Sequence, residues 1–396
     1  MVMEQQQAEN NILAAKLEYI PSVNASMGHN LSWGRSVNLN DLEIVENKLS
    51  QSSSMGLSAS LPLFEGFRKQ NNIKSNIKLL EMARANTEEL KDNISISVVK
   101  AYLQVLLSKE IEKCAEESYK SVSMQVETAG ELVDAGSQTY SSLLEIKSQL
   151  ANEKLQLVTA RNNTAGALLE LTQLLNMEEV KDFDIVAPDC TVPHMDIEEG
   201  DLQEIYSTAL DMPRIQKAHL ALQQSQLQYK IQKGAALPTI SFSAGYNTFY
   251  SDSQRSAYFT QFNNNRNPSM GFSLSIPIFN NWRTNTAIRN ARSNVENSRI
   301  GVEISKQNLK KEIQLAYNDA LSSFTKMKAA AENMEAALES FKLTQEKFNL
   351  GMLNGTDYST AKANLSKAES EYLQCKYQYI FQRKILDYYR NIPLTL

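Results

Sequence analysis

The chain contains one segment twice, and this duplication restricts the fold more than any other feature. "GLSASLPLFEGFRKQNNI" at residues 56–73 and "GFSLSIPIFNNWRTNTAI" at 271–288 align without a gap and share seven of eighteen residues. Upstream, "IPSVNASMGHN" at 20–30 resembles "LPTISFSAGYN" at 237–247, at an offset of 217 instead of 215. Units of this length are too long for a solenoid repeat, so each copy is expected to be a complete structural half.

Each copy begins with a segment in which apolar residues alternate with serine, the period that predicts a β-strand. Pro62 and Pro277 occupy matching places near the end of this alternation. Proline cannot donate to a strand ladder, so both prolines are expected at a strand-to-helix transition. With the upstream segments, each half contributes one strand hairpin, at about 20–64 and about 238–278, closed by a loop rich in Ser and Asn.

A long proline-free stretch follows each hairpin, at about 68–134 and about 283–348. Its second copy shows a heptad pattern, which predicts a coiled coil, and a helix of about 65 residues is roughly 100 Å long. Gly136 and Gly351 stand where the pattern breaks, before a second helix returns. Either glycine could terminate a helix in a tight turn or lie at an exposed contact tip. The d positions of the heptad are Ile313, Ala320, Met327, Met334, Phe341 and Phe348, and its a positions are Tyr317, Phe324, Ala331, Leu338 and Gln345.

These patterns predict two repeats joined by an irregular linker at 179–200. The first, 1–178, holds the strand hairpin and a helical hairpin at about 67–175. The second, 201–396, holds a helix at about 201–233, the second strand hairpin and a helical hairpin at about 282–390. Residues 1–18 match only the end of the 201–233 helix. The first repeat is therefore expected to be truncated, with a signal peptide missing.

Composition and motifs argue against several classes of function. The chain has 40 basic and 45 acidic residues, so nucleic acid is not expected as a partner. No nucleotide-binding or metalloprotease motif occurs. We therefore expect no enzyme activity, no catalytic residues, no cofactor and no metal. The three cysteines, Cys114, Cys190 and Cys375, form no metal-binding spacing, and the histidines His29, His194 and His219 have no paired ligands.

Two hairpins next to rods of this length have no obvious soluble core, which favours a membrane. Four strands cannot close a barrel, and a Ser-rich face suggests a wet lumen of twelve strands or more, which three chains would supply. Aromatic residues at the strand-to-helix junction fit a membrane interface: Phe64, Phe67, Phe279 and Trp282. The predicted fold class is mainly α with a small β part, in which long antiparallel coiled-coil helices form a trimeric α-barrel and four strands per chain contribute to a 12-stranded transmembrane β-barrel.

The order of these motifs resembles the TolC-type outer-membrane efflux proteins over essentially the whole chain. The residues that carry the resemblance are "SLPLFEGFR" and "SIPIFNNWR", "ISISVVKAYLQVLL", the two tips, "ARNN" at 160–163 and the lead-in "DMPRIQKAHLALQQSQLQYKIQKGAALPTISFSAGY". The resemblance implies a homotrimer in the outer membrane of a Gram-negative bacterium that extends into the periplasm. It also implies an inner-membrane pump and a periplasmic adaptor that docks at the helical tips, here Gly136, Gly351 and Gly355. The chain would be the passive exit duct of a tripartite efflux or type I secretion system.

The resemblance also implies a ring of aspartates at the pore constriction. Asp357 stands six residues after Gly351 and matches the first of them, whereas the second position is Thr360. The residues that hold this tip closed in the family correspond to Phe348 and Leu353, so the closing mechanism does not transfer. Asp357 could instead cap the returning helix.

A soluble coiled-coil scaffold without transport activity is the main alternative. It would explain the long helices, but it would not explain duplicated alternating strands that carry serine on one face.

Overall fold

The structure is a computed structural model that describes residues 2–37, 44–177, 183–186, 192, 194–350 and 352–394. The chain divides into two compact units, residues 1–87 with 216–304 and residues 88–215 with 305–396. Each of these units contains part of both sequence repeats, so the two units are not the two repeats. The repeat boundaries at 178 and 201 stay a prediction.

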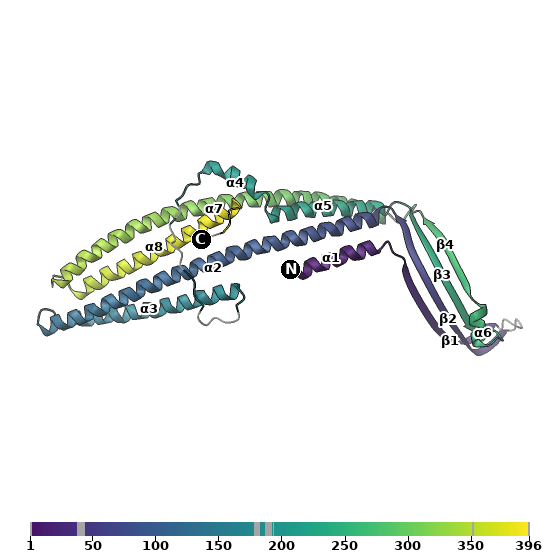
Figure 1. Cartoon of the computed structure of the whole chain (residues 1–396), viewed down its shortest axis with the longest axis horizontal. Helices are drawn as coiled ribbons and strands as arrows, with labels where there is room; N and C mark the ends of the chain where they lie inside the picture. Colours follow the sequence, from purple (N-terminus) through teal and green to yellow (C-terminus); the bar gives the residue numbers. More distant parts are fainter. Residues whose placement is uncertain are drawn as a thin grey trace. The chain divides into compact units, whose positions relative to one another are not determined.

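The first unit contains a four-stranded antiparallel sheet in the order β1–β2–β3–β4 (Figure 1). Its strands are β1 (Ser22–Val37), β2 (Ile44–Glu65), β3 (Thr239–Ser251) and β4 (Asn267–Ser275). The two hairpins join because β2 pairs with β3, as in the pair Leu57 and Tyr246. Within the described residues, β1 and β4 each have a strand neighbour on one side only.

The connection between β3 and β4 is more ordered than the sequence suggests. Its Ser- and Asn-rich composition predicts a loop, but the structure contains a short helix there, α6 (Tyr258–Asn264). Gln261 fixes this helix to the sheet, because its side-chain oxygen accepts a hydrogen bond from the Ser251 backbone N–H at 2.9 Å. The prediction of an unstructured loop is wrong in this segment.

Helices α1 (Val2–Leu17), α5 (Pro213–Gly234) and the first part of α2 (Arg68–Asp134) also belong to the first unit. Gln5 donates to Thr87 at 2.8 Å, which joins α1 to α2. Gln228 donates to Ser75 at 3.0 Å, which joins α5 to α2. The two short helices therefore lie against the same long helix.

The helix expected over about 201–233 is interrupted. The structure has a 3₁₀ turn η1 (Glu199–Asp201), then α4 (Leu202–Ala209), then α5 from Pro213. Proline has no N–H and is accommodated only in the first turn of a helix, so Pro213 starts a new helix instead of continuing α4. The expectation of one continuous helix is wrong for this reason.

In the second unit, two pairs of helices meet in one core. They are the end of α2 with α3 (Tyr140–Leu174), and the end of α7 (Arg283–Asn349) with α8 (Gly355–Tyr389). Each helix contributes a fully buried side chain: Val122, Ile146, Phe348 and Tyr358. Figure 1 shows α3 running back beside the end of α2, and α8 beside α7.

The heptad pattern matches the burial along α7. The d residues Ile313, Ala320 and Phe348 are fully buried, whereas Met334 is half-buried. At about 1.5 Å per residue, the 67 residues of α2 and of α7 give helices roughly 100 Å long. In the part of the chain that the structure describes, no helix has the length and apolarity needed to cross a membrane.

Candidate functional sites

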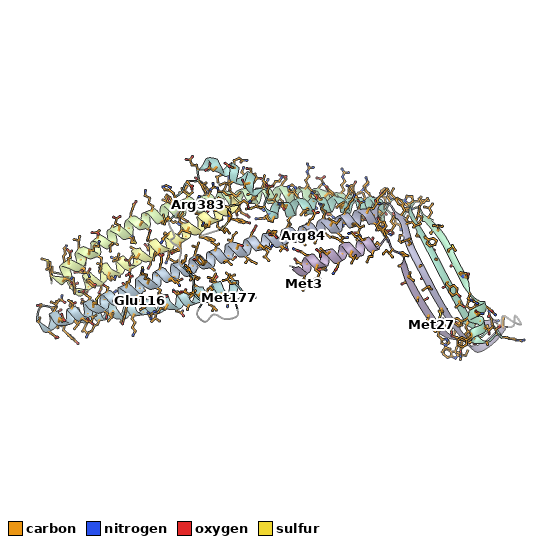
Figure 2. All side chains as sticks on the ribbon, in the orientation of Figure 1. Met3, Met27, Arg84, Glu116, Met177 and Arg383 are labelled. Carbon is orange, nitrogen blue, oxygen red and sulfur yellow. The ribbon has the colours of Figure 1, made fainter. Side chains whose placement is uncertain are left out.

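The sheet has one apolar face and one polar face. On β4, Met270, Phe272 and Leu274 are 83%, 75% and 62% exposed, and they alternate with Ser and Gly. On β1, exposed apolar residues likewise alternate with polar ones, and Met27 is labelled in Figure 2. A continuous exposed apolar surface of this kind requires lipid or another protein to cover it.

The opposite face carries Ser, Asn and Gly across all four strands. One row can be followed through the pairings: Ser26 opposite Gly56, Gly56 opposite Asn247, and Asn247 opposite Asn267. These side chains are short and, apart from glycine, polar, so water can hydrate this face and little of the space beside it is filled. It can therefore border an aqueous space.

The two prolines lie close to the strand ends in different ways. Pro62 is inside β2 opposite Ser241, three residues before the strand ends at Glu65, and the register shifts between Pro62 and Phe64. Pro277 lies two residues after the end of β4, and α7 begins at Arg283. Proline lacks the backbone N–H that a strand ladder needs. Pro62 accordingly lies at the register shift of β2, and Pro277 lies just after strand pairing ends in β4.

Both strand-to-helix junctions use the same backbone device, which sequence reasoning missed. Gly66 and Phe67 have φ angles of 59° and 63°, and Asn281 and Trp282, 215 positions later, have 53° and 60°. Two successive left-handed residues bend the chain between strand and helix at each junction. For bulky residues such as Phe67 and Trp282 this conformation is strained, so tertiary contacts must maintain it.

At the first junction, two glycines allow two backbone segments to touch. A Cβ on Gly66 would collide with the carbonyl oxygen of Gly234 and lie 2.9 Å from the Leu237 Cβ. A Cβ on Gly234 would lie 2.6 Å from the Arg68 Cγ. The β2–α2 turn and the α5–β3 turn can therefore approach this closely only because both positions are glycine.

The predicted interface aromatics gather around these junctions. The Phe64 and Phe67 rings meet edge to face with centroids 5.3 Å apart. Phe279 is 73% exposed, and Trp282 is 58% exposed with the Arg289 guanidinium 6.0 Å from its ring. Exposed aromatics also lie at the far end of the sheet: Trp33, Phe249 and Phe259.

Lys69 is a buried cation that sequence reasoning did not single out. Its ammonium group donates to the carbonyl oxygens of Glu18 at 2.6 Å and Pro62 at 2.8 Å. It also lies 5.2 Å from the centre of the Tyr19 ring. Lys69 therefore ties the end of α1 and the end of β2 to the start of α2. The matching residue in the second copy is Thr284, so no periodic signal marked it.

The helix-to-helix turns in the second unit contain the predicted tip residues. Gly136 has a φ of 75° in the turn between α2 and α3. Thr139 caps α3 by accepting a hydrogen bond from the Ser142 N–H at 3.3 Å. Gly351 lies outside the described residues. The structure thus places Gly136 in a left-handed turn, the conformation for which glycine is preferred.

Gly355 is buried, unlike an exposed contact residue. A Cβ there would lie 2.7 Å from the Glu145 Oε2 and 3.1 Å from the Ser142 carbonyl oxygen. Gly355 therefore lets the start of α8 pack closely on α3. This position does not suit the predicted contact with an adaptor, which requires a surface residue.

Asp357 is exposed, and it does not cap the helix. The N-cap of α8 is Asn354, whose side-chain oxygen accepts a hydrogen bond from the Asp357 N–H at 2.8 Å. Asp357 lies in the first turn, where a carboxylate interacts favourably with the helix dipole. It borders a groove of about 550 Å³ between α7 and α8, lined mainly by polar residues. The capping alternative is therefore wrong for this residue.

Buried ionisable groups lie where α3 packs against α8. Glu153 is 1% exposed and accepts a hydrogen bond from Gln149 at 2.7 Å, while its second oxygen has no partner among the described residues. Tyr358 is fully buried with an unpartnered hydroxyl, and burial followed by the Glu153 charge raises its pKa to about 12. Burial also raises the pKa of Glu369, and the nearby Lys362 ammonium partly opposes this shift. The contact between these helices therefore contains polar groups that are not fully satisfied.

Comparison with known proteins assigns the family. The chain matches the family described as "Outer membrane efflux protein" over residues 1–177 and 205–387. Because this match covers most of the chain, the chain belongs to that family. The family consists of outer-membrane channels of Gram-negative bacteria and not of enzymes, so the expected class, location and absence of catalysis are confirmed at this level.

The similar proteins are distant in sequence. Outer membrane efflux protein BepC of Brucella suis is 22% identical over 311 residues, which are 78% of this chain and 63% of BepC. The chain thus spans less than two thirds of that relative. Outer membrane protein TolC of Escherichia coli is 20% identical over 370 residues, 83% of this chain and 72% of TolC.

Solved structures confirm the fold. The Campylobacter jejuni CmeC outer membrane channel superposes with a TM-score of 0.76 at 17% identity, covering 98% of this chain and 80% of CmeC. VceC of Vibrio cholerae gives 0.78 at 12% identity, covering 100% of this chain and 92% of VceC. The predicted combination of long helices and four antiparallel strands is correct, and the family match rejects the soluble scaffold.

Proposed function

We propose that three copies of this chain form a passive outer-membrane exit duct that serves a tripartite efflux or type I secretion system. The observation that carries the proposal is the two-faced sheet, whose edge strands β1 and β4 each have one strand neighbour among the described residues. Its apolar face suits lipid and its Ser, Asn and Gly face suits water. Four strands per chain close a sheet around an aqueous lumen when three chains contribute twelve.

The dimensions of the sheet support the membrane assignment. The continuous β2–β3 pairing runs over ten steps, from Ser241 to Ser251. At about 3.3 Å per residue and a tilt near 45°, this length covers an apolar band of about 25 Å. The aromatics near Phe67 and Trp282 on one side, and near Trp33 on the other, lie where two interfaces would be.

The proposed partners follow from the helical part of the chain. A periplasmic adaptor would dock at the turn around Gly136, and an inner-membrane pump would deliver the substrate. AprF of Pseudomonas aeruginosa, 22% identical over 345 residues, is described as an alkaline protease secretion protein, and this supports including type I secretion in the proposal.

Planar-bilayer conductance of the purified protein tests the duct directly. We expect stepwise currents from protein whose mass is three times the 44.5 kDa of one chain. Leu57 lies at the middle of the β2–β3 pairing, opposite Tyr246. Leu57→Lys places a charge on the apolar face there and is expected to abolish insertion, because a midplane charge costs about 2–4 kcal/mol per chain. Ser58→Lys places the same charge on the polar face and is expected to insert but to alter ion selectivity. Equal insertion of both variants would contradict the proposal.

A further inference from the structure

Both edges of the sheet expose the same alternation of apolar and polar side chains. An open edge is a template for another strand. We infer that β4 of one copy pairs antiparallel with β1 of the next copy in the register that places Ser275 opposite the partner's Ser26. This inference rests on the proposed assembly of three copies, and it specifies the contact residue by residue.

The internal repeat supplies the register. β4 repeats β2 at an offset of 215, and β1 corresponds to β3 at an offset of 217. The pairing of β2 with β3 inside the chain is therefore a copy of the pairing between chains. Ser60 lies opposite Ser243 in the structure. The same offsets transfer this pair to Ser275 and the partner's Ser26.

The faces of the two edge strands agree with this register independently. Directly opposed residues in a sheet share a face. The register sets Leu274 opposite the partner's Met27, and Met270 opposite the partner's Leu31, and all four side chains are exposed in the single chain. A slip of one residue would oppose serine to an apolar residue along the whole seam. A slip of two would preserve the faces, and only the repeat decides against it.

The base of the seam must differ from its internal counterpart. The close approach of Gly66 and Gly234 would transfer to Asn281 and the partner's Leu17. Both of these residues carry a Cβ, so the backbones cannot come as close. The inferred register therefore applies to β4, on the N-terminal side of Pro277. On the C-terminal side of Pro277, toward Asn281, the backbones of the two copies must lie farther apart.

Disulfide trapping tests the register in the full chain, with Cys114, Cys190 and Cys375 replaced by serine. The inferred pairs are Ser275→Cys with Ser26→Cys, and Leu274→Cys with Met27→Cys. Their matched internal controls are Ser60→Cys with Ser243→Cys, and Ala59→Cys with Ala244→Cys. Neighbouring antiparallel pairs alternate between two geometries, so at least one control pair has the shorter separation.

The off-register pairs are Ser273→Cys with Ser26→Cys, and Ser273→Cys with Asn30→Cys. They correspond to slips of two residues in either direction. Within one chain, β1 and β4 are three strand spacings apart, about 14 Å, which no disulfide spans. Any bond in these pairs therefore joins two copies.

For an inferred pair whose internal control also forms a disulfide, we expect covalent dimers and trimers on non-reducing gels. The yield of this cross-linked product should be at least tenfold higher than the yield from either off-register pair. A dominant off-register pair, or a light-scattering trimer with no bond while the controls form, would overturn the register and leave the duct intact. A monomer by light scattering would instead overturn the proposed assembly.

Discussion

Individual backbone positions determine how strand becomes helix in this chain. The left-handed pairs Gly66–Phe67 and Asn281–Trp282 recur 215 positions apart although only one of the four residues is glycine. Residue type alone does not predict such a conformation for Phe67 or Trp282. The contacts around each junction impose it, which explains why the alternating pattern located the strands but not these turns.

Gly66→Ala is expected to destabilise the protein by more than about 2 kcal/mol, because the left-handed φ and the collision with the Gly234 carbonyl oxygen both oppose a methyl group. Gly130→Ala is the matched control, since Gly130 is helical with nothing within 4 Å of its Cβ position. That control should gain up to about 1 kcal/mol. Thermal unfolding followed by circular dichroism in detergent measures both, and equal melting temperatures would refute the close approach.

Tyr358→Phe should leave stability unchanged or raise it by about 1 kcal/mol, because the hydroxyl is buried without a partner in the described structure. Tyr358→Ala should instead cost about 3–5 kcal/mol by leaving a cavity among Phe341, Phe348 and neighbouring side chains. Chemical denaturation of the two variants separates the ring from the hydroxyl. A large loss in the phenylalanine variant would mean that the hydroxyl has a partner.

At the scale of elements, the sequence predicted most of the helices and strands. Proline-free stretches and period-two alternation located the long helices and both hairpins, and the heptad identified Ile313, Ala320 and Phe348 as core. The helix break at Pro213 and the helix start at Asn354 could also have been predicted, because proline and asparagine favour these positions. The burial of Glu153 and Lys69 could not be predicted, because each is covered by an element distant in sequence.

The stability of the second unit should depend on pH through Glu369, a half-buried carboxyl on α8. Burial raises the folded-state pKa of this carboxyl, so the folded protein holds the proton more tightly than the unfolded chain. Its contribution to stability is complete below its ordinary pKa and is lost as pH rises through the raised value. Glu369→Gln should therefore melt higher than the parent protein at neutral pH, and the difference should shrink toward about pH 4.

Melting temperatures of the two proteins between pH 4 and pH 8 give this measurement. Glu371→Gln, an exposed neighbour on the same helix, serves as the control and should run parallel to the parent. Parallel curves for the Glu369 variant as well would show that this carboxyl does not titrate in the range.

At the scale of the whole molecule, Asp357 is the residue through which the helical turns would act on transported ions. In a trimer its exposed carboxylate occurs three times, and three such charges favour cations by their field. Asp357→Ala should lower the cation-to-anion permeability ratio without changing trimer mass, whereas Asp357→Glu should preserve it. Reversal potentials in a salt gradient measure the ratio, and an unchanged value in the alanine variant would remove Asp357 from the pore.

The open edges of the sheet also determine how the assembly can form. Among the described residues, one copy has two edge strands with a neighbour on one side only. In the proposed assembly a row of two copies still has two such edges, because each added copy covers one edge and brings another. Only the joining of the last copy to the first removes both at once. In the proposed ring, closure is therefore the step that removes the open edges that favour aggregation, and partial assemblies should be short-lived compared with the complete ring.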